Sequence, residues 1–116
     1  GVQTCALPIL CPKDSWGARA HLLRAGIFRT LGRFDESIED GEIACHLAPR
    51  MFAFHAHLAA SYGMAHRLEE GRQAWAHALA LEPALSLDLL LARRGVAHPR
   101  RQQAIEVGLR NIGITR

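Results

Sequence analysis

The chain has 116 residues, of which 49% are hydrophobic, and this suits one small domain with room for about three helical hairpins. No apolar run approaches the roughly 20 residues that a membrane-spanning helix needs, which excludes a transmembrane segment. The formal charge of +3 is modest, and the three cysteines, Cys5, Cys11 and Cys45, have no CxxC spacing. An odd, unpatterned set argues against a disulfide framework or a structural zinc site, so we expect a reducing, cytoplasmic setting.

Residues 1–11, GVQTCALPILC, share no pattern with the rest of the chain and resemble translated junction sequence. We therefore expect a non-native or disordered leader without functional weight. Pro12 then closes an element, and Asp14 or Ser15 can cap a helix through a side-chain oxygen. Apolar residues at spacings of three and four predict the first helix, from Trp16 to about Leu31.

Gly32 ends that helix, and the acids from Asp35 onwards favour a second helix that runs to about Leu47. A third helix is predicted from Met51 to about Ala65 and a fourth from Leu68 to about Leu81. Pro49 and Pro83 stop the second and fourth helices. Proline ends a helix because it lacks the amide donor and clashes with the preceding turn.

The stretch from Leu31 to Pro49 recurs 34 residues later, from Ala65 to Pro83. Aligned pairs include Arg33 with Arg67, Ala44 with Ala78, and Pro49 with Pro83. A fixed period of this length is typical of repeated helical hairpins. Alanines at matching places let paired helices approach closely, and larger side chains fill the space between neighbouring helices. The residues assigned to these two roles are Ala25, Ala44, Ala59 and Ala78, and Phe28, Phe34, Tyr62, Leu68 and Trp75.

The pattern decays after Pro83. A short apolar helix is predicted over Leu85–Arg93, and a last helix over Pro99–Asn111, opened by its proline. A helical array needs a terminal cap over its last apolar face, and residues 84–116 are predicted to be a degenerate third hairpin in that role. Residues 12–83 then form two full hairpins.

The two repeats resemble the tetratricopeptide repeat family, whose pattern of small, aromatic, turn and closing residues they fill. This resemblance implies an all-α fold of antiparallel helix-hairpin repeats, an α-solenoid that serves as a scaffold for protein–protein interaction. The matching residues are Ala25, Phe28, Leu31, Gly32, Phe34, Ala44 and Pro49, then Leu58, Ala59, Tyr62, Leu68, Trp75, Ala78 and Pro83. His21, Arg24, Gly41, His66 and Gly71 depart from the pattern.

The segment from Arg93 to Pro99, followed by the run Gly108-Leu109-Arg110-Asn111-Ile112-Gly113, is similar to the end of the repeat domain of bacterial class III adenylate cyclases and related multidomain regulators. That resemblance implies the C-terminal regulatory part of a larger bacterial signalling protein. It does not make this segment itself catalytic.

Nothing in the sequence indicates catalysis, a cofactor or a metal centre. His55 and His57 are two apart and so point to different sides of a helix, and no HExxH or His-x-x-x-His pair falls in a predicted helix. The acids Asp35, Glu36, Glu39 and Asp40 share helix faces, but such runs are usually solvated. Cys45 reads as a small buried residue.

Binding is the function that the resemblance implies. In tetratricopeptide arrays the first helix of each pair lines a concave face, where small residues leave room for a ligand and arginines add positive charge. The expected occupant is a protein or peptide, such as an acidic or amphipathic helix. The predicted partner-binding residues are Arg19, Leu22, Gly26, Arg29, Ala53, Ala56, Ala60, Gly63 and Met64, with Leu87 and Leu90 from the cap.

Two alternatives stay open. The acidic second helix, which holds Glu39 and Asp40, could dock with the basic end of another copy and make this a self-association module. The segment from Arg93 to Arg116 contains six arginines and one acid, Glu106, and this basic end could contact nucleic acid. No aromatic residue lies among them and no recognition-helix signature surrounds them, so nucleic acid is the less favoured of the two.

Overall fold

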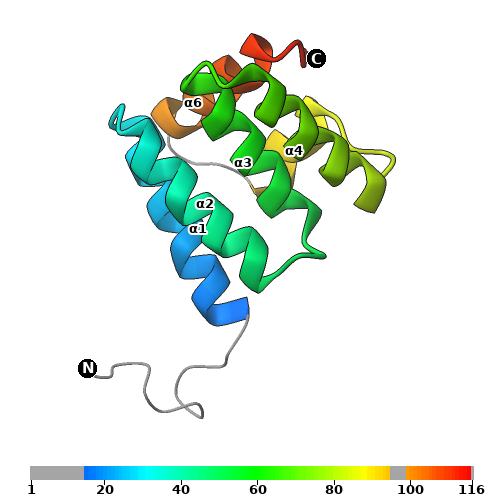
Figure 1. Ribbon diagram of the computed structural model, residues 1–116. Coiled ribbons are helices and arrows are strands. Elements are labelled where there is room, and N and C mark those ends of the chain that lie inside the picture. Colours follow the sequence, from blue (N-terminus) through cyan, green and yellow to red (C-terminus); the bar gives the residue numbers. More distant parts are fainter. Residues whose placement is uncertain (1–14, 95–98, 116) are drawn as a thin grey trace, which may run out of the picture.

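The computed structural model describes residues 15–94 and 99–115, and this part of the chain is all α-helical (Figure 1). The expectations for residues 1–14 lie outside it. The helices are α1 (Ser15–Thr30), α2 (Phe34–Leu47), α3 (Phe52–Met64), α4 (Leu68–Leu81), α5 (Leu87–Arg94) and α6 (Pro99–Asn111). The predicted fold class is confirmed: α1 packs on α2 and α3 packs on α4 as consecutive hairpins.

The turns inside the two hairpins have the same geometry. At the end of α1, Gly32 has a φ of 84° and the amide of Arg33 donates to the carbonyl of Phe28 at 2.9 Å. At the end of α3, His66 has a φ of 61° and the amide of Arg67 donates to the carbonyl of Tyr62 at 2.9 Å. These left-handed helix ends satisfy carbonyls that the helix leaves unpaired. The 34-residue sequence repeat is therefore also a repeat of backbone geometry.

Side chains at these turns repeat as well. Arg33 forms an ion pair with Glu36, and Arg67 forms one with Glu70, each across three residues at the start of the following helix. The guanidinium carbon lies 5.1 Å from the ring centre of the aromatic residue before the turn in both cases. Each exposed pair adds little to stability, because solvent screens it, but both pairs lie where the chain enters α2 and α4.

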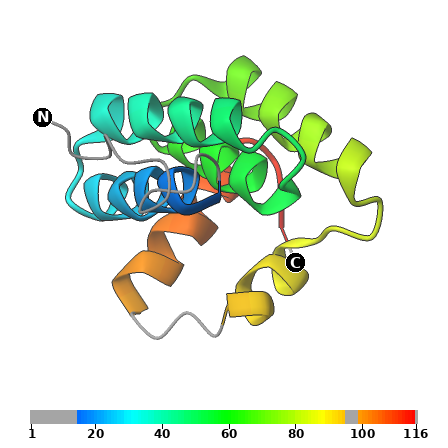
Figure 2. The same cartoon turned by 90° about the horizontal axis from the view of Figure 1, so that it is seen from below.

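The helices lie in three layers (Figure 2). Helices α2 and α4 form one outer layer, α1 and α3 form the middle layer, and α5 and α6 lie on the opposite side. Helix α6 packs mainly against α3 and also against α1, whereas it touches α5 little. The last two helices thus differ from the first two pairs.

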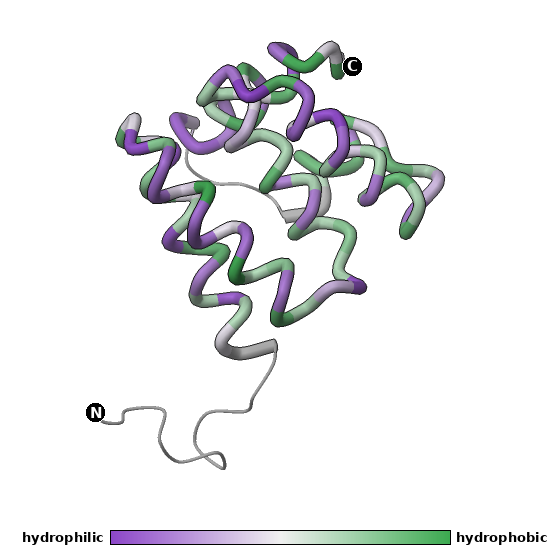
Figure 3. Tube along the Cα trace, viewed as in Figure 1, coloured by the Kyte–Doolittle hydropathy of each residue, from purple (hydrophilic) through white to green (hydrophobic). Residues whose placement is uncertain are grey.

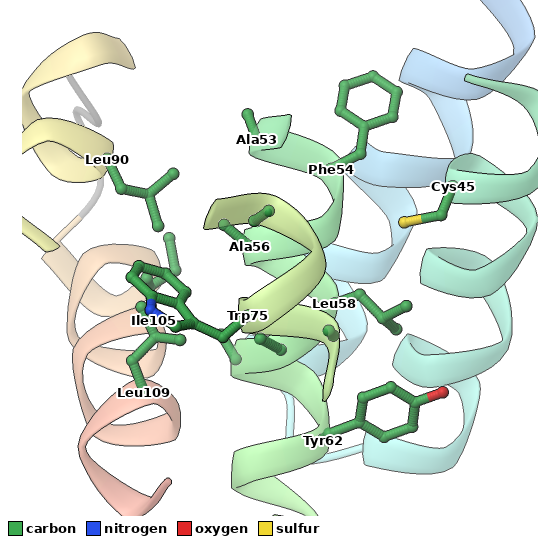
Figure 4. Close-up of a cluster of buried hydrophobic side chains, with 14 of the residues drawn as sticks. Cys45, Ala53, Phe54, Ala56, Leu58, Tyr62, Trp75, Leu90, Ile105 and Leu109 are labelled. Atoms are coloured by element: carbon green, nitrogen blue, oxygen red, sulfur yellow. The ribbon is translucent and has the colours of Figure 1, made fainter. Parts of the chain in front are cut away.

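Helix α3, in the middle layer, is the apolar centre of the molecule (Figure 3). Helix α3 is buried along most of its length, and Ala56, Ala59 and Ala60 have no exposed surface. Large side chains fill the space on two opposite sides of α3 (Figure 4). Leu58 and Tyr62 point towards α2, while Trp75 of α4 lies beside residues of α5 and α6. None of the helices within the described residues is long and apolar enough to cross a membrane.

Candidate interaction face

The residues predicted to bind a partner lie on one side of the middle layer, which we name the α1–α3 face. It consists of the predicted residues on those two helices, Arg19, Leu22, Gly26, Arg29, Ala53, Ala56, Ala60, Gly63 and Met64. Arg19 is exposed; Leu22, Gly26 and Met64 are half-buried; and Arg29, Ala53, Ala56, Ala60 and Gly63 are buried. Leu87 and Leu90 of α5 are buried as well. The structure brings most of these residues together but leaves few of them accessible.

Helix α6 covers this face, and it does so at backbone contact. A Cβ atom added to Gly63 would lie 2.7 Å from the carbonyl carbon of Gly108. A Cβ atom added to Gly108 would lie 2.9 Å from the carbonyl carbon of Ala60. Both distances are far inside van der Waals contact, so only glycine fits at either position. The small residues that the sequence analysis assigned to a ligand's place are in contact with the chain's own last helix.

Polar and apolar contacts fix α6 on each side of this crossing. Asn111 donates from Nδ2 to the carbonyl of Gly63 at 3.1 Å, which uses a carbonyl near the end of α3. Ile105 and Leu109 lie beside Trp75 of α4 (Figure 4). Because α6 reaches both α3 and α4, it covers the last apolar side of the second hairpin as a cap would.

The α1–α3 face is therefore not the open surface that the sequence analysis expects. The predicted cap has the right helices, but α6 crosses the middle layer instead of forming a hairpin with α5 that continues the array. The physical reason is that Ala60, Gly63 and Gly108 let two helices meet backbone to backbone, and Trp75 offers an apolar wall beside them. Partner binding at this face stays a prediction.

A buried polar chain crosses from α1 to α2 beneath this face. Arg29, which is 3% exposed, donates from Nη1 to the carbonyl of His57 at 3.0 Å and to Oγ of Ser61 at 2.9 Å. Ser61 and Ser37 lie 2.8 Å apart, and Ser37 donates to the carbonyl of Ala25 at 2.7 Å. The network joins the two hairpins through groups that would otherwise be costly to bury.

A second hollow, of about 640 Å³, lies on the other side of the molecule between α2 and α4. It holds several titratable groups, among them Cys45, His55 and His77. Burial, with the nearby charge of Glu42, raises the pKa of the Cys45 thiol to about 12, so it is not a nucleophile at neutral pH. Within residues 15–94 and 99–115, no three His, Cys, Asp or Glu side chains are placed to hold a metal ion.

His55 and His77 stack in this hollow, with ring centres 4.2 Å apart. His55 donates from Nε2 to the carbonyl of Pro49 at 2.9 Å. Burial lowers the pKa of His55, and the neighbouring His77 lowers it further. Burial and the neighbouring His77 both favour a neutral His55 ring. This ring holds the start of α3 to the end of α4, so its role is structural.

Three residues of the helix that lies on the face, Ala104, Gly108 and Asn111, are not among the predicted partner-binding residues. The spacing of Ala104 and Gly108, four residues apart on a helix, was the available signal, since small residues at that spacing permit close helix contact. The prediction of a capping third hairpin instead places this helix against α5.

Searches with this chain against protein-family models, curated proteins and solved structures found no match. The residues that the structure describes thus form an all-helical domain of six helices built on two antiparallel hairpins.

Proposed function

We propose that this chain is a protein-interaction module of the tetratricopeptide type, and that the α1–α3 face binds a helical segment of a partner protein in place of α6. The repeated turns at Gly32 and His66 and the repeated pairs Arg33–Glu36 and Arg67–Glu70 support the repeat assignment. A cytoplasmic setting within a larger signalling protein belongs to the same proposal.

One observation carries the proposal: a helix already lies on this face. Ile105, Leu109 and Ile112 of α6 are all buried at the edge of this face, where Ile105 and Leu109 lie beside Trp75 of α4. Their spacing of four and then three residues is that of an amphipathic helix. Burial of each such side chain contributes about 1.5 to 3 kcal/mol. The face therefore has the shape and apolarity that a helical ligand needs.

Helix α6 is covalently attached, so a partner has to compete with it. A tethered ligand acts at an effective concentration on the order of 1 mM. A partner helix that binds the uncovered face well will show a lower apparent affinity for the native chain, because only the fraction without α6 on the face is competent.

The test removes α6 from the face in the full chain. Gly108→Leu places a branched side chain against the Ala60 carbonyl, which the crossing cannot accommodate. The probe is a labelled synthetic peptide of residues 99–115. We expect the Gly108→Leu chain to bind this peptide, by fluorescence anisotropy, at least tenfold more tightly than the native chain does.

Matched controls separate the face from general stickiness. A 99–115 peptide that itself carries Gly108→Leu should bind neither chain, and the chain variant Gln103→Leu, on the exposed side of α6, should behave like the native chain. A Gly108→Leu chain with native helical circular dichroism that fails to bind the native peptide contradicts the proposal.

Self-association is the second candidate function, and one observation favours it. Leu23 and Ile27 of α1 and Leu31, just past its end, follow one another at four-residue spacing, and they are 50%, 43% and 65% exposed. A stripe of this kind on a helix is a surface that another apolar surface can cover. In self-association, a second copy of the chain covers this stripe.

A further inference from the structure

Arg29 differs from Arg24, Arg33 and Arg67 in the groups that surround its guanidinium. Arg24 lies 3.4 Å from Asp40, and Arg33 and Arg67 pair with glutamates. For Arg29 the described residues provide no ion pair, and its Nε is buried without a hydrogen-bond partner. Burial lowers its pKa only to about 10, so the guanidinium is charged at neutral pH. A buried cation with an unused donor lies under the α1–α3 face.

Such an arrangement is unfavourable for the isolated fold. Removing a guanidinium from water is costly unless a counter-charge compensates, and an unpaired buried donor adds to that cost. The carbonyl of His57 lies inside α3, where it accepts a backbone amide, and the hydroxyl of Ser61 keeps Ser37, 2.8 Å away, as its partner. An apolar side chain at position 29 would therefore leave no orphaned acceptor.

The bound helix is the element that can supply the missing charge. Helix α6 packs against α1 as well as α3. Ile105 and Leu109 lie beside Trp75 of α4, and Gly108 contacts α3. At 100° per residue, Ala104 and Asn111 follow Gly108 around α6. Arg100 and Val107 come after them, on the side away from Trp75 and so towards α1. Val107 is half-buried, and Arg100 lies two turns before it on the same side.

We infer that Arg29 is the residue of the α1–α3 face that recognises a carboxylate on a bound helix, so that the partner is an amphipathic helix with an Asp or Glu on the edge that faces α1. This inference rests on the proposed function of the face. The carboxylate occupies the place that Val107 or Arg100 holds in α6. The guanidinium then gains a charge-assisted hydrogen bond inside a site from which water is excluded.

The first test is a double-mutant cycle in the full chain. Val107→Glu and Val107→Gln have nearly the same shape and differ by one charge, and Arg100→Glu and Arg100→Gln form a second pair. Each is made with Arg29 and with Arg29→Met, and thermal unfolding midpoints are measured. We expect the Glu variant of at least one pair to melt higher than its Gln partner, by about 4 °C or more. That advantage should disappear with Arg29→Met.

The second test uses the Gly108→Leu chain and 99–115 peptides that carry Val107→Glu or Val107→Gln. The Glu peptide should bind about tenfold more tightly, which is about 1.4 kcal/mol. Arg29→Met in the chain should abolish the difference. If no peptide binds, the proposed function fails. If both peptides bind equally well, only the assignment of Arg29 fails.

The two tests do not depend on the same variant. Should Gly108→Leu prevent folding, the cycle in the otherwise native chain still decides the matter. Equal Glu and Gln midpoints at both positions, or a difference that persists with Arg29→Met, overturns the inference. An exposed pair on α6, Gln103→Glu against native Gln103, should show no coupling to Arg29.

Discussion

At the scale of single residues, His66 shows how one position departs from the repeat without breaking it. It occupies the left-handed turn that Gly32 occupies in the first hairpin, with a φ of 61° against 84°. A side chain with a Cβ pays roughly 1 to 2 kcal/mol for this conformation, whereas glycine does not. The hydrogen bonds of the two turns are nevertheless the same. At His66 the repeat thus has a strained residue, while the turn around it is unchanged.

His66→Gly should raise the free energy of unfolding by about 1 kcal/mol, because the turn keeps its hydrogen bonds and loses the strain. Urea denaturation measures the change. Gly32→Ala is the matched reverse substitution and should lower stability by a similar amount. Equal midpoints for His66→Gly and the native chain would show that His66 is not strained.

His55 gives the chain a dependence on pH. Its pKa is lowered in the folded state, so the unfolded state binds more protons as the pH falls below about 6.5. The stabilisation is fully present above pH 6.5 and is lost progressively below it. The ring contacts His77 of α4 and the Pro49 carbonyl. The other titratable groups that line the same hollow are Glu42, Cys45, His46, Tyr62 and Glu70.

We expect the thermal midpoint to fall between pH 7.5 and pH 5.5, and His55→Gln to reduce that fall. The glutamine amide can donate to the Pro49 carbonyl in place of Nε2 but does not titrate. The comparison of native and His55→Gln midpoints at both pH values is the measurement. A slope that His55→Gln leaves unchanged would assign the effect to another group.

At the scale of elements, close pairing of helices depends on alanines in α2 and α4. Ala44 and Ala78 have no exposed surface and lie at equivalent places 34 residues apart. Neither helix has a side chain at its start that caps it by a hydrogen bond. Packing, more than local capping, therefore holds these helices in place.

Ala44→Leu and Ala78→Leu should each lower the free energy of unfolding by roughly 1 to 3 kcal/mol, since extra methylene groups in a packed interface push the helices apart. Denaturant titration measures the loss. Ala76→Leu is a control on the exposed side of α4 and should change stability little. Unchanged melting of both buried variants would contradict the hairpin packing.

At the scale of the whole molecule, the two ends of the array differ. The apolar side of the second hairpin, around Trp75, is covered by α5 and α6. The opposite side of the array, on the first hairpin, carries the stripe of Leu23, Ile27 and Leu31. In the second hairpin the residue equivalent to Ile27 is Ser61, which α1 and α2 cover to 1% exposure. The stripe is thus the surface on which a further hairpin-like element would pack.

Light scattering after size exclusion distinguishes two forms of self-association. Association through the stripe should survive high salt and should be abolished by Ile27→Glu, because the contact is apolar. Docking of the acidic α2 on a basic end should weaken as salt rises. A monomer at every salt and protein concentration removes self-association as a function of this chain.

The sequence by itself determined the helices, the hairpins and their period. The helices that end shortly before Gly32, Pro49 and Pro83 do so because of local backbone chemistry. Apolar spacing sets which side of each helix is buried. These features depend on residues close together in the chain, so they can be read from it. The polar chain from Arg29 to Ser37 and the strain at His66 could not be read, because each depends on a neighbouring helix or on a backbone angle.

Only the tertiary structure decided where α6 lies. Its amphipathic pattern fits a cap on α4 and a ligand on the α1–α3 face about equally well, since both uses bury Ile105, Leu109 and Ile112. The choice was made by the backbone contact of Gly108 with Ala60 and Gly63, almost fifty residues away, where the absence of side chains lets two helices meet. Packing between distant small residues is a property of the folded surface, and no local pattern specifies it.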